Sequence, residues 1–253
     1  MVDGIVTGHE ARFDFPHHNG VIHPFLLATT PRSGSSWFGH ELWATGCLGA
    51  PIEYLNFVPD SPLGHLRRDR AAQVRHWTKT LATRTSPNGV FGVKAFVPQF
   101  EELGHLNPPL LAQVMRFLMD RGPRSKVVHL VRRDRIAHAV SYARASLSGR
   151  WRAAQEGEGQ GEPPFAREAV EVTLREIEWQ EQSWATMFAD LKLAPLRIVY
   201  EDARADLHSA IAEIAAYLGV PIDPARAVTV PAIERQRQDG AKAWIEAYKS
   251  CSS

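Results

Sequence analysis

Short apolar runs alternate along this chain with longer stretches whose apolar residues recur at helical spacing. Four apolar runs, bounded by turn residues, are predicted strands: 21–29, 90–96, 126–131 and 196–200. The stretches of helical period are predicted helices: 35–45, 67–83, 109–120, 136–146, 167–191 and 206–218. Strands that alternate with helices in this way form a mostly parallel central sheet flanked by helices on both faces. We therefore predict a three-layer α/β fold.

The remaining segments carry loop or tail composition. Residues 1–20 are polar and rich in charge and histidine, so we expect a flexible N-terminus. Residues 149–164 are rich in Gly, Glu and Gln and contain two prolines, which predicts a mobile loop. Residues 233–249 read as a basic segment followed by a helix face with Trp244 and Tyr248. No internal repeat is evident, and we expect a single domain over residues 1–253.

Composition narrows the function classes. The chain is 44% hydrophobic and 23% charged, with a formal net charge of +1, which argues against a broad nucleic-acid surface. No stretch approaches the roughly 18 consecutive apolar residues of a membrane span, and no secretory signal core is evident, so a soluble cytoplasmic protein is expected. Two distant cysteines favour a reducing compartment. The eleven histidines form no recognisable ligand set, and no metal is predicted.

The loop at residues 30–37, between the first predicted strand and helix, has the composition of a phosphate-binding turn. It contains one cation in a Gly/Ser-rich turn, followed by an aromatic residue: Arg32, Ser33, Gly34, Ser35, Ser36 and Trp37. Backbone N–H groups at a helix N-terminus attract anions, and glycine lets a ligand approach closely. The Lys-Ser/Thr of nucleoside-triphosphatase loops is absent. The alternative is an ordinary solvated turn.

A second candidate anion site follows the third predicted strand. Arg132 and Arg133 stand at its end, and Ser141 lies eight residues after Arg133. If residues 136–146 are helical, a phosphate bridging the two groups would be needed to join Ser141 to Arg133. The alternative is that these arginines pair with Asp134 or other surface acids. Because ligands bind beyond the carboxyl ends of parallel strands, this site and the 30–37 loop can converge.

Taken together, the two candidate sites resemble those of sulfotransferases that use 3′-phosphoadenosine 5′-phosphosulfate (PAPS), which have a P-loop-like fold. The chain is most similar to the bacterial trehalose 2-sulfotransferase type. The matching motifs occur in order over residues 25–248: Arg32-Ser-Gly-Ser35, Ala44-Thr-Gly46, Pro51-x-Glu53, Pro87-Asn-Gly-Val-Phe-Gly-x-Lys94, Ala139-Val-Ser141, Glu234-Arg-Gln236 and Trp244…Tyr248. Two features depart from that type: Trp37 replaces an aliphatic residue, and the segment 60–86 is shorter. These departures concern the identity of the sulfuryl acceptor. They leave the assignment of PAPS as the donor unchanged.

The resemblance implies how the nucleotide is held. The 30–37 loop would bind the 5′-phosphosulfate, with Arg32 neutralising charge on the leaving phosphate. Arg133 and Ser141 would bind the 3′-phosphate, and Arg132 can replace Arg133 if the register differs by one residue. Arg235 and Gln236 would form a C-terminal clamp near the nucleotide, unless they belong to a solvated basic tail. After transfer the product is 3′-phosphoadenosine 5′-phosphate (PAP).

The resemblance also implies the catalytic groups. Glu53 holds the position of the proposed carboxylate base, and would either accept the proton of the acceptor hydroxyl or orient it. Lys94 would stabilise the transferring group or pair with Glu53. The acceptor would be a hydroxyl of a sugar, a glycolipid or another small molecule, and a homodimer is expected. Aromatic residues that would either line the acceptor site or belong to the core are Tyr54, Phe57, Phe91, Phe96, Tyr142 and Trp151.

Two other function classes fit the phosphate-binding turn. One is a kinase or another nucleoside-triphosphate enzyme. The absence of the phosphate-loop lysine and of an evident set of magnesium ligands argues against this class. The other is a non-catalytic nucleotide-binding module, against which stand Glu53 and Lys94.

Overall fold

A computed structural model of the protein describes residues 6–156, 161–234, 236 and 239–250. Its centre is a sheet of four strands, β1 (His23–Ala28), β2 (Val90–Ala95), β3 (Lys126–Val131) and β4 (Leu196–Val199). The strands lie in the order β2-β1-β3-β4, and every neighbouring pair is parallel. The predicted parallel sheet flanked by helices is confirmed.

The helices that surround the sheet follow the predicted pattern, with two additions. They are α1 (Ser35–Ala44), α2 (Arg70–Thr83), α3 (Val97–Leu106), α4 (Pro108–Met119), α5 (Arg135–Ser148), α6 (Arg167–Asp190), α7 (Tyr200–Ala205), α8 (Leu207–Leu218) and α9 (Asp239–Ser250). Short 3₁₀ turns lie at Ala11–Phe13, Gly64–Leu66, Gly122–Arg124, Ala153–Gln155 and Pro224–Arg226. The sequence analysis did not predict α3 and α7, because each follows a strand directly and its first residues continue the apolar run.

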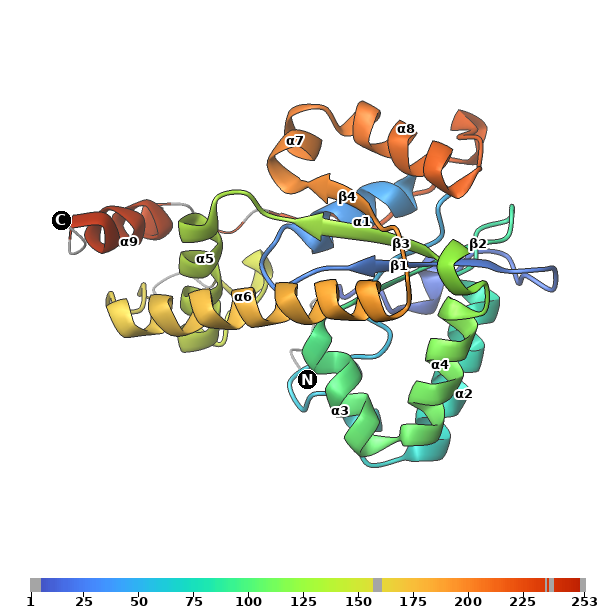
Figure 1. The fold of residues 1–253 in the computed structure, drawn as a ribbon, viewed down its shortest axis with the longest axis horizontal. Helices are drawn as coiled ribbons and strands as arrows, with labels where there is room; N and C mark the ends of the chain where they lie inside the picture. The colour runs from blue at the N-terminus through green and yellow to red at the C-terminus, as the bar shows by residue number, and fades with distance from the viewer. Residues whose placement is uncertain (1–5, 157–160, 235, 237–238, 251–253) are drawn as a thin grey trace.

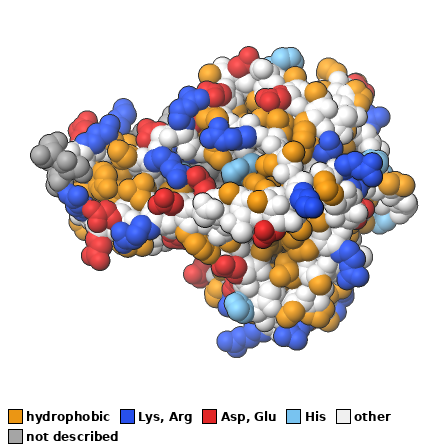
Figure 2. Space-filling model, viewed as in Figure 1, with side chains coloured by type: hydrophobic (Ala, Val, Ile, Leu, Met, Phe, Trp, Pro, Cys, Tyr) orange, Lys and Arg blue, Asp and Glu red, His pale blue; other side chains and the backbone are white. Residues whose placement is uncertain are grey.

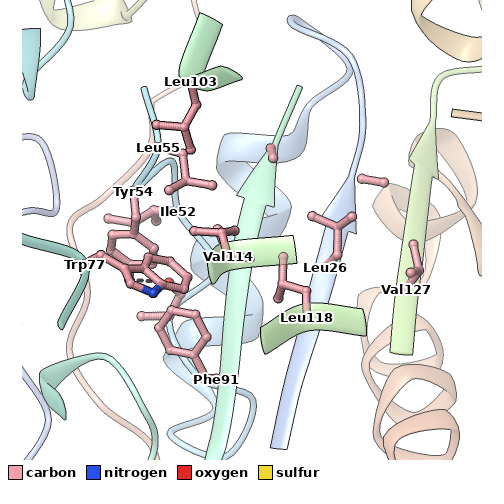
Figure 3. Close-up of a cluster of buried hydrophobic side chains, with 14 of the residues drawn as sticks. Leu26, Ile52, Tyr54, Leu55, Trp77, Phe91, Leu103, Val114, Leu118 and Val127 are labelled. Carbon is pink, nitrogen blue, oxygen red and sulfur yellow. Dashed lines mark hydrogen bonds between the residues drawn. The ribbon is translucent and has the colours of Figure 1, made fainter. Parts of the chain in front are cut away.

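Side-chain alternation along the strands divides the core into two layers. In β1, Leu26 and Ala28 pack on one face with residues of α2, α3, α4 and α6, whereas Phe25 and Leu27 pack on the other with α1, α7 and α8. Figure 3 shows the first layer, where Leu26 lies near Val114 and Leu118 of α4, and Trp77 lies over Phe91. The central strand β1 and its neighbour β2 are largely buried on both faces, as is typical of parallel sheets, whereas only Ile198 is buried in the edge strand β4.

A third apolar cluster forms a lobe beyond the carboxyl ends of the strands. There α5, the first half of α6 and α9 pack around Val140, Ile177 and Trp244. In Figure 1 the strand arrows point toward this lobe. Loops that follow the strands therefore lie between the sheet and the lobe, and Lys and Arg side chains, with acidic ones among them, are visible near this junction in Figure 2.

Two segments whose composition predicts a flexible N-terminus and a mobile loop contain tertiary contacts or a short turn over part of their length. Residues 6–20 pack against the body of the molecule: Phe15 is buried, and buried Arg84 binds the carbonyls of Glu10 and Phe13. Of the segment 149–164, Ala153–Gln155 forms a 3₁₀ turn and residues 157–160 lie outside the described residues. Long-range hydrogen bonds, which local composition does not reveal, account for the difference. No helix in the described part of the chain is both long and apolar enough to cross a membrane.

Candidate active site

The loop between β1 and α1 is held in place by tertiary hydrogen bonds. The Thr29 hydroxyl donates to the Leu130 carbonyl of β3 at 2.9 Å and lies 2.7 Å from the Ser33 hydroxyl, which is fully buried. An imidazole nitrogen of His138, on α5, donates to the Pro31 carbonyl at 2.8 Å. Because β3 and α5 both contact the loop, it is preorganised rather than free to adapt.

The backbone of this loop is shaped to expose N–H groups. Arg32 and Gly34 have positive φ angles of 65° and 91°, and Gly34 is the N-cap of α1 without any side chain to satisfy the first N–H groups of the helix. A Cβ atom at Gly34 would lie 2.2 Å from the ring of Tyr200, so only glycine fits. This helix end presents donors and a positive dipole to an anion.

The guanidinium of Arg32 joins three segments that are distant in sequence. Its Nε donates to the Ser141 hydroxyl at 3.1 Å, one terminal nitrogen to the Trp151 carbonyl at 2.6 Å, and the other to the Gln236 side-chain oxygen. All three partners are neutral, and among the described residues no carboxylate forms an ion pair with Arg32. Burial, followed by the charges of Arg132 and Arg144, lowers the pKa of Arg32 to about 10. A half-buried cation that forms no ion pair with a carboxylate of the described residues, beside a helix N-terminus, fits a phosphate-bearing group.

A second cluster contains the candidate base. An isolated parallel bridge between Ile52 and Val93 sets Glu53 beside Lys94. The Lys94 ammonium lies 2.9 Å from a carboxylate oxygen of Glu53 and donates to the Ser36 hydroxyl, also at 2.9 Å. Lys94 thus links the candidate base to the first turn of α1.

The Glu53 carboxylate is held in its charged form. Asn56 and Gln99 each donate a side-chain N–H to its other oxygen at 2.9 Å. Burial raises the pKa of Glu53, but the charge of Lys94 and the hydrogen bonds from Lys94, Asn56 and Gln99 outweigh it, so the pKa lies below its ordinary value of 4.5. Glu53 is therefore ionised at neutral pH.

Arg133 does not join Ser141 in this structure. Its guanidinium is 61% exposed and pairs with Asp202 of α7, while Ser141 accepts from Arg32. This matches the surface-acid alternative raised from the sequence. Arg132 is more buried: it donates to the Arg32 carbonyl at 3.2 Å and lies over the ring of Tyr200 at 5.4 Å. The predicted site residue Arg235 lies outside the described residues.

Several residues of this region were not predicted. Tyr200 packs against Gly34 and lies edge-on to Trp37, whose ring also carries the guanidinium of Arg204 at 4.6 Å. Tyr200 directly follows the fourth strand, and a position at a strand's carboxyl end was the signal that could have identified it.

Of the candidate acceptor aromatics, Tyr54, Phe57 and Phe91 belong to the core instead. Among the described residues, no three His, Cys, Asp or Glu side chains are arranged to hold a metal ion.

Comparison with known proteins extends the geometric picture. The family model of the Stf0 sulphotransferases matches residues 24–251. Trehalose 2-sulfotransferase of Mycobacterium tuberculosis is 26% identical over 91% of this chain and 96% of its own. The protein of the same name from Mycolicibacterium smegmatis is 24% identical over 90% of this chain and 95% of its own.

Solved structures give more distant similarities. Mouse sulfotransferase SULT7A1, complexed with PAP, is 14% identical with a TM-score of 0.48; the match covers 84% of this chain but only 63% of the mouse chain, less than two thirds of it. A sulfotransferase from Alicyclobacillus acidocaldarius is 16% identical with a TM-score of 0.45 over 92% of both chains. The match of the family model to nearly the whole chain shows that this protein belongs to the Stf0 sulphotransferase family and is a sulfotransferase enzyme.

Proposed function

We propose that this enzyme transfers the sulfuryl group of PAPS to a hydroxyl of a sugar-containing small molecule, with Glu53 as the base. The observation that carries the proposal is that Arg32 and Glu53 both lie at the N-terminus of α1. Arg32 belongs to the loop that leads into this helix, and Lys94 connects the Glu53 carboxylate to Ser36 in its first turn. The curated trehalose 2-sulfotransferases, which match over 90% or more of this chain, support a sugar acceptor. A free sugar, a glycolipid and another small molecule with a hydroxyl all fit the proposal.

The nucleotide side of the site consists of the 30–37 loop and the groups around Arg32. The N–H groups at the start of α1 and the Arg32 guanidinium would hold the 5′-phosphosulfate, with Ser35, Ser36 and Trp37 in the same turn. Bound PAPS would supply an activated sulfuryl group, whose transfer leaves negative charge on a phosphate oxygen. Arg32, which has no carboxylate partner among the described residues, is placed to stabilise such charge.

We assign the 3′-phosphate to Arg133 and Ser141, and we place Gln236 and Arg235 near the nucleotide, because these residues resemble the motifs of PAPS-dependent sulfotransferases. In the structure Ser141 and Gln236 both contact Arg32, so binding of a nucleotide would have to redirect these hydrogen bonds. Arg133 would have to leave Asp202, and both partners of this ion pair are more than 60% exposed. Exposed ion pairs are weak and exchange partners easily.

On the acceptor side, Glu53 would take the proton as the hydroxyl attacks. Its lowered pKa makes it a weak base while the Lys94 ammonium is 2.9 Å away. A negative group beside Ser36 would attract the ammonium and weaken its hold on the carboxylate, which raises the basicity of Glu53 when it is needed. The same position allows the carboxylate to orient the hydroxyl.

Calorimetric titration with PAP and with ATP·Mg²⁺, followed by transfer from ³⁵S-labelled PAPS to trehalose, glucose and a glucosyl lipid, tests the proposal. We expect micromolar PAP binding, weak ATP binding and labelling of at least one acceptor. Tight ATP binding without PAP binding would contradict the nucleotide assignment. PAP binding without labelling of any of the three acceptors would contradict the sugar assignment alone.

A further inference from the structure

The segment before β1 forms a strap across the molecule. We use the name N-terminal strap for residues 6–15. The buried Arg84 anchors it: its guanidinium donates to the carbonyls of Glu10 and Phe13 at 3.0 and 3.2 Å and lies 2.9 Å from the carboxylate of Asp14. A backbone hydrogen bond of 2.8 Å from Phe15 to Thr83 fixes its end. The strap is therefore an ordered part of the fold.

The strap runs beside the candidate base. Gly8 lies against His40 and Trp43 of α1 and against Ile52, the residue before Glu53. The ring of the next strap residue, His9, lies edge-on to Tyr54, the residue after Glu53, with ring centres 5.9 Å apart. The strap therefore contacts the residues that precede and follow Glu53 in the sequence.

The far end of the strap reaches the nucleotide side. The Val6 carbonyl accepts a hydrogen bond of 3.0 Å from Arg152, and the carbonyl of the neighbouring Trp151 accepts from Arg32. The strap thus connects the surroundings of Glu53 with those of Arg32.

His40 has a ring nitrogen that the fold leaves without a partner. Its Nδ1 lies 2.7 Å from the Ser36 carbonyl and must donate to it, so Nε2 of the neutral ring carries a bare lone pair. That Nε2 is buried, forms no hydrogen bond, and is 3.6 Å from the position that a Cβ of Gly8 would occupy. His40 is 7% exposed. Buried polar atoms in native proteins nearly always have a partner, and a ligand would supply one here.

His9, the strap residue that follows Gly8, carries a second imidazole. The described structure gives its ring aromatic contacts with Tyr54 and His76, but no hydrogen bond. Burial and nearby positive groups lower the pKa of His9 to about 3, and burial lowers that of His40 to about 4, so both rings are neutral at physiological pH. Neutral imidazoles without a partner accept hydrogen bonds from hydroxyl groups but do not attract anions.

We propose that His9 and His40 form a hydroxyl-recognising pair that binds the non-reacting hydroxyls of a polyol acceptor while Glu53 engages the reacting one. This inference rests on the proposed function and specifies its acceptor site. His9 precedes residue 24, where the match to the Stf0 family begins, so the strap adds to this site a residue that the family model does not include.

The test compares four variants with the wild type in transfer from ³⁵S-PAPS, using whichever of trehalose, glucose and a glucosyl lipid is labelled best. His40→Phe and His9→Phe keep an aromatic ring but remove the lone pair, and each should raise KM for the acceptor about tenfold, the effect of one lost hydrogen bond. His40→Phe also removes the Nδ1 donor to the Ser36 carbonyl, so its melting temperature is measured beside KM. PAP affinity should stay within twofold. His40→Gln restores an acceptor atom and should recover part of the loss.

The matched control is His129→Phe. His129 is also a buried histidine with an unpartnered Nε2, but it packs against Phe188 on α6, so its replacement should leave the acceptor KM unchanged. If KM for the acceptor stays within twofold of wild type in both His40→Phe and His9→Phe, the proposed binding of acceptor hydroxyls by these histidines is wrong. If His40→Phe does not fold, the comparison of His9→Phe with wild type decides. PAP binding by a wild type that labels no acceptor would refute the sugar assignment, and this pair with it.

Discussion

Two ion pairs lie near the carboxyl ends of the strands. They differ in the exposure of their side chains and in the further hydrogen bonds that their carboxylates accept. Lys94 and Glu53 have side-chain exposures of 3% and 23%, and further hydrogen bonds reach the carboxylate from two amides. Arg133 and Asp202 are 61% and 62% exposed. Both pairs contain a residue that the sequence motifs nominate for function.

The difference indicates that the burial of an ion pair, more than its position at the sheet edge, determines whether its partners can be exchanged. A buried charge must keep its partner because water cannot replace it, whereas an exposed pair contributes little and can exchange its partner for a ligand. We infer that Lys94 and Glu53 stay in contact, and that a bound negative group weakens their attraction without separating them. We also infer that Asp202 pairs with Arg133 until a ligand replaces it. The following predictions test this contrast.

Lys94→Met should have the largest effect. It leaves the Glu53 carboxylate without its cation, and removal of one partner from a buried pair costs about 3 kcal/mol of unfolding free energy. Turnover should fall at least 100-fold as well, since the link to Ser36 is lost. Urea unfolding and sulfuryl transfer measure the two effects. Wild-type stability in this variant would mean that the pair is not a structural unit.

Glu53→Gln should act on chemistry more than on folding. The amide keeps the volume and can still accept from Lys94, but it cannot take a proton, so turnover should fall about 100-fold or more. PAP affinity should stay within twofold, because Glu53 has no contact with Arg32. Near-normal turnover would remove Glu53 from the mechanism.

Arg133→Ala should have a moderate and selective effect. If Arg133 holds the 3′-phosphate, PAP affinity should drop about fivefold to tenfold, the range for a charge-assisted contact at an exposed site. Adenosine 5′-phosphate, which lacks that phosphate, should bind as before, and the melting temperature should not change. Equal losses for both nucleotides would show that the 3′-phosphate is bound elsewhere.

The pH dependence of stability should show the smallest effect. Because folding lowers the pKa of Glu53 below 4.5, its ionised form stabilises the native state above that pH, and the contribution is lost as the pH falls further. The unfolding free energy of the wild type should therefore decrease relative to Glu53→Gln between about pH 5 and pH 3. Parallel curves for the two proteins would contradict the lowered pKa.

Local sequence patterns predicted most of the architecture. The four strands were predicted within two residues of their observed ends, and Gly219 ends α8 as expected, with a φ of 72°. By contrast, α7 was read as the end of a strand and a loop, because Tyr200 continues the apolar run that begins at Leu196. Tyr200, the first residue of this helix, packs against Gly34, a contact over 166 positions that no local pattern contains.

The candidate site shows the same division. Arg32, Glu53 and Lys94 were nominated from motifs, and the parallel bridge of Ile52 with Val93 then places the last two in contact. The expected partner of Ser141 was Arg133, but the structure joins Ser141 to Arg32. The sequence shows that both arginines lie at strand ends, and only the packing of α5 against the loop shows which of them Ser141 faces.

By itself the sequence determined the parallel α/β fold, the Gly/Ser-rich turn at residues 30–37 and the chemical types at the candidate site, because strand alternation, helix period and turn composition depend on neighbouring residues. The tertiary structure alone decided which charges are buried, which groups share Arg32, and that the N-terminal strap lies beside Glu53. Burial and pairing arise from contacts between segments up to 204 positions apart, and their energies depend on the removal of water, which no local pattern records.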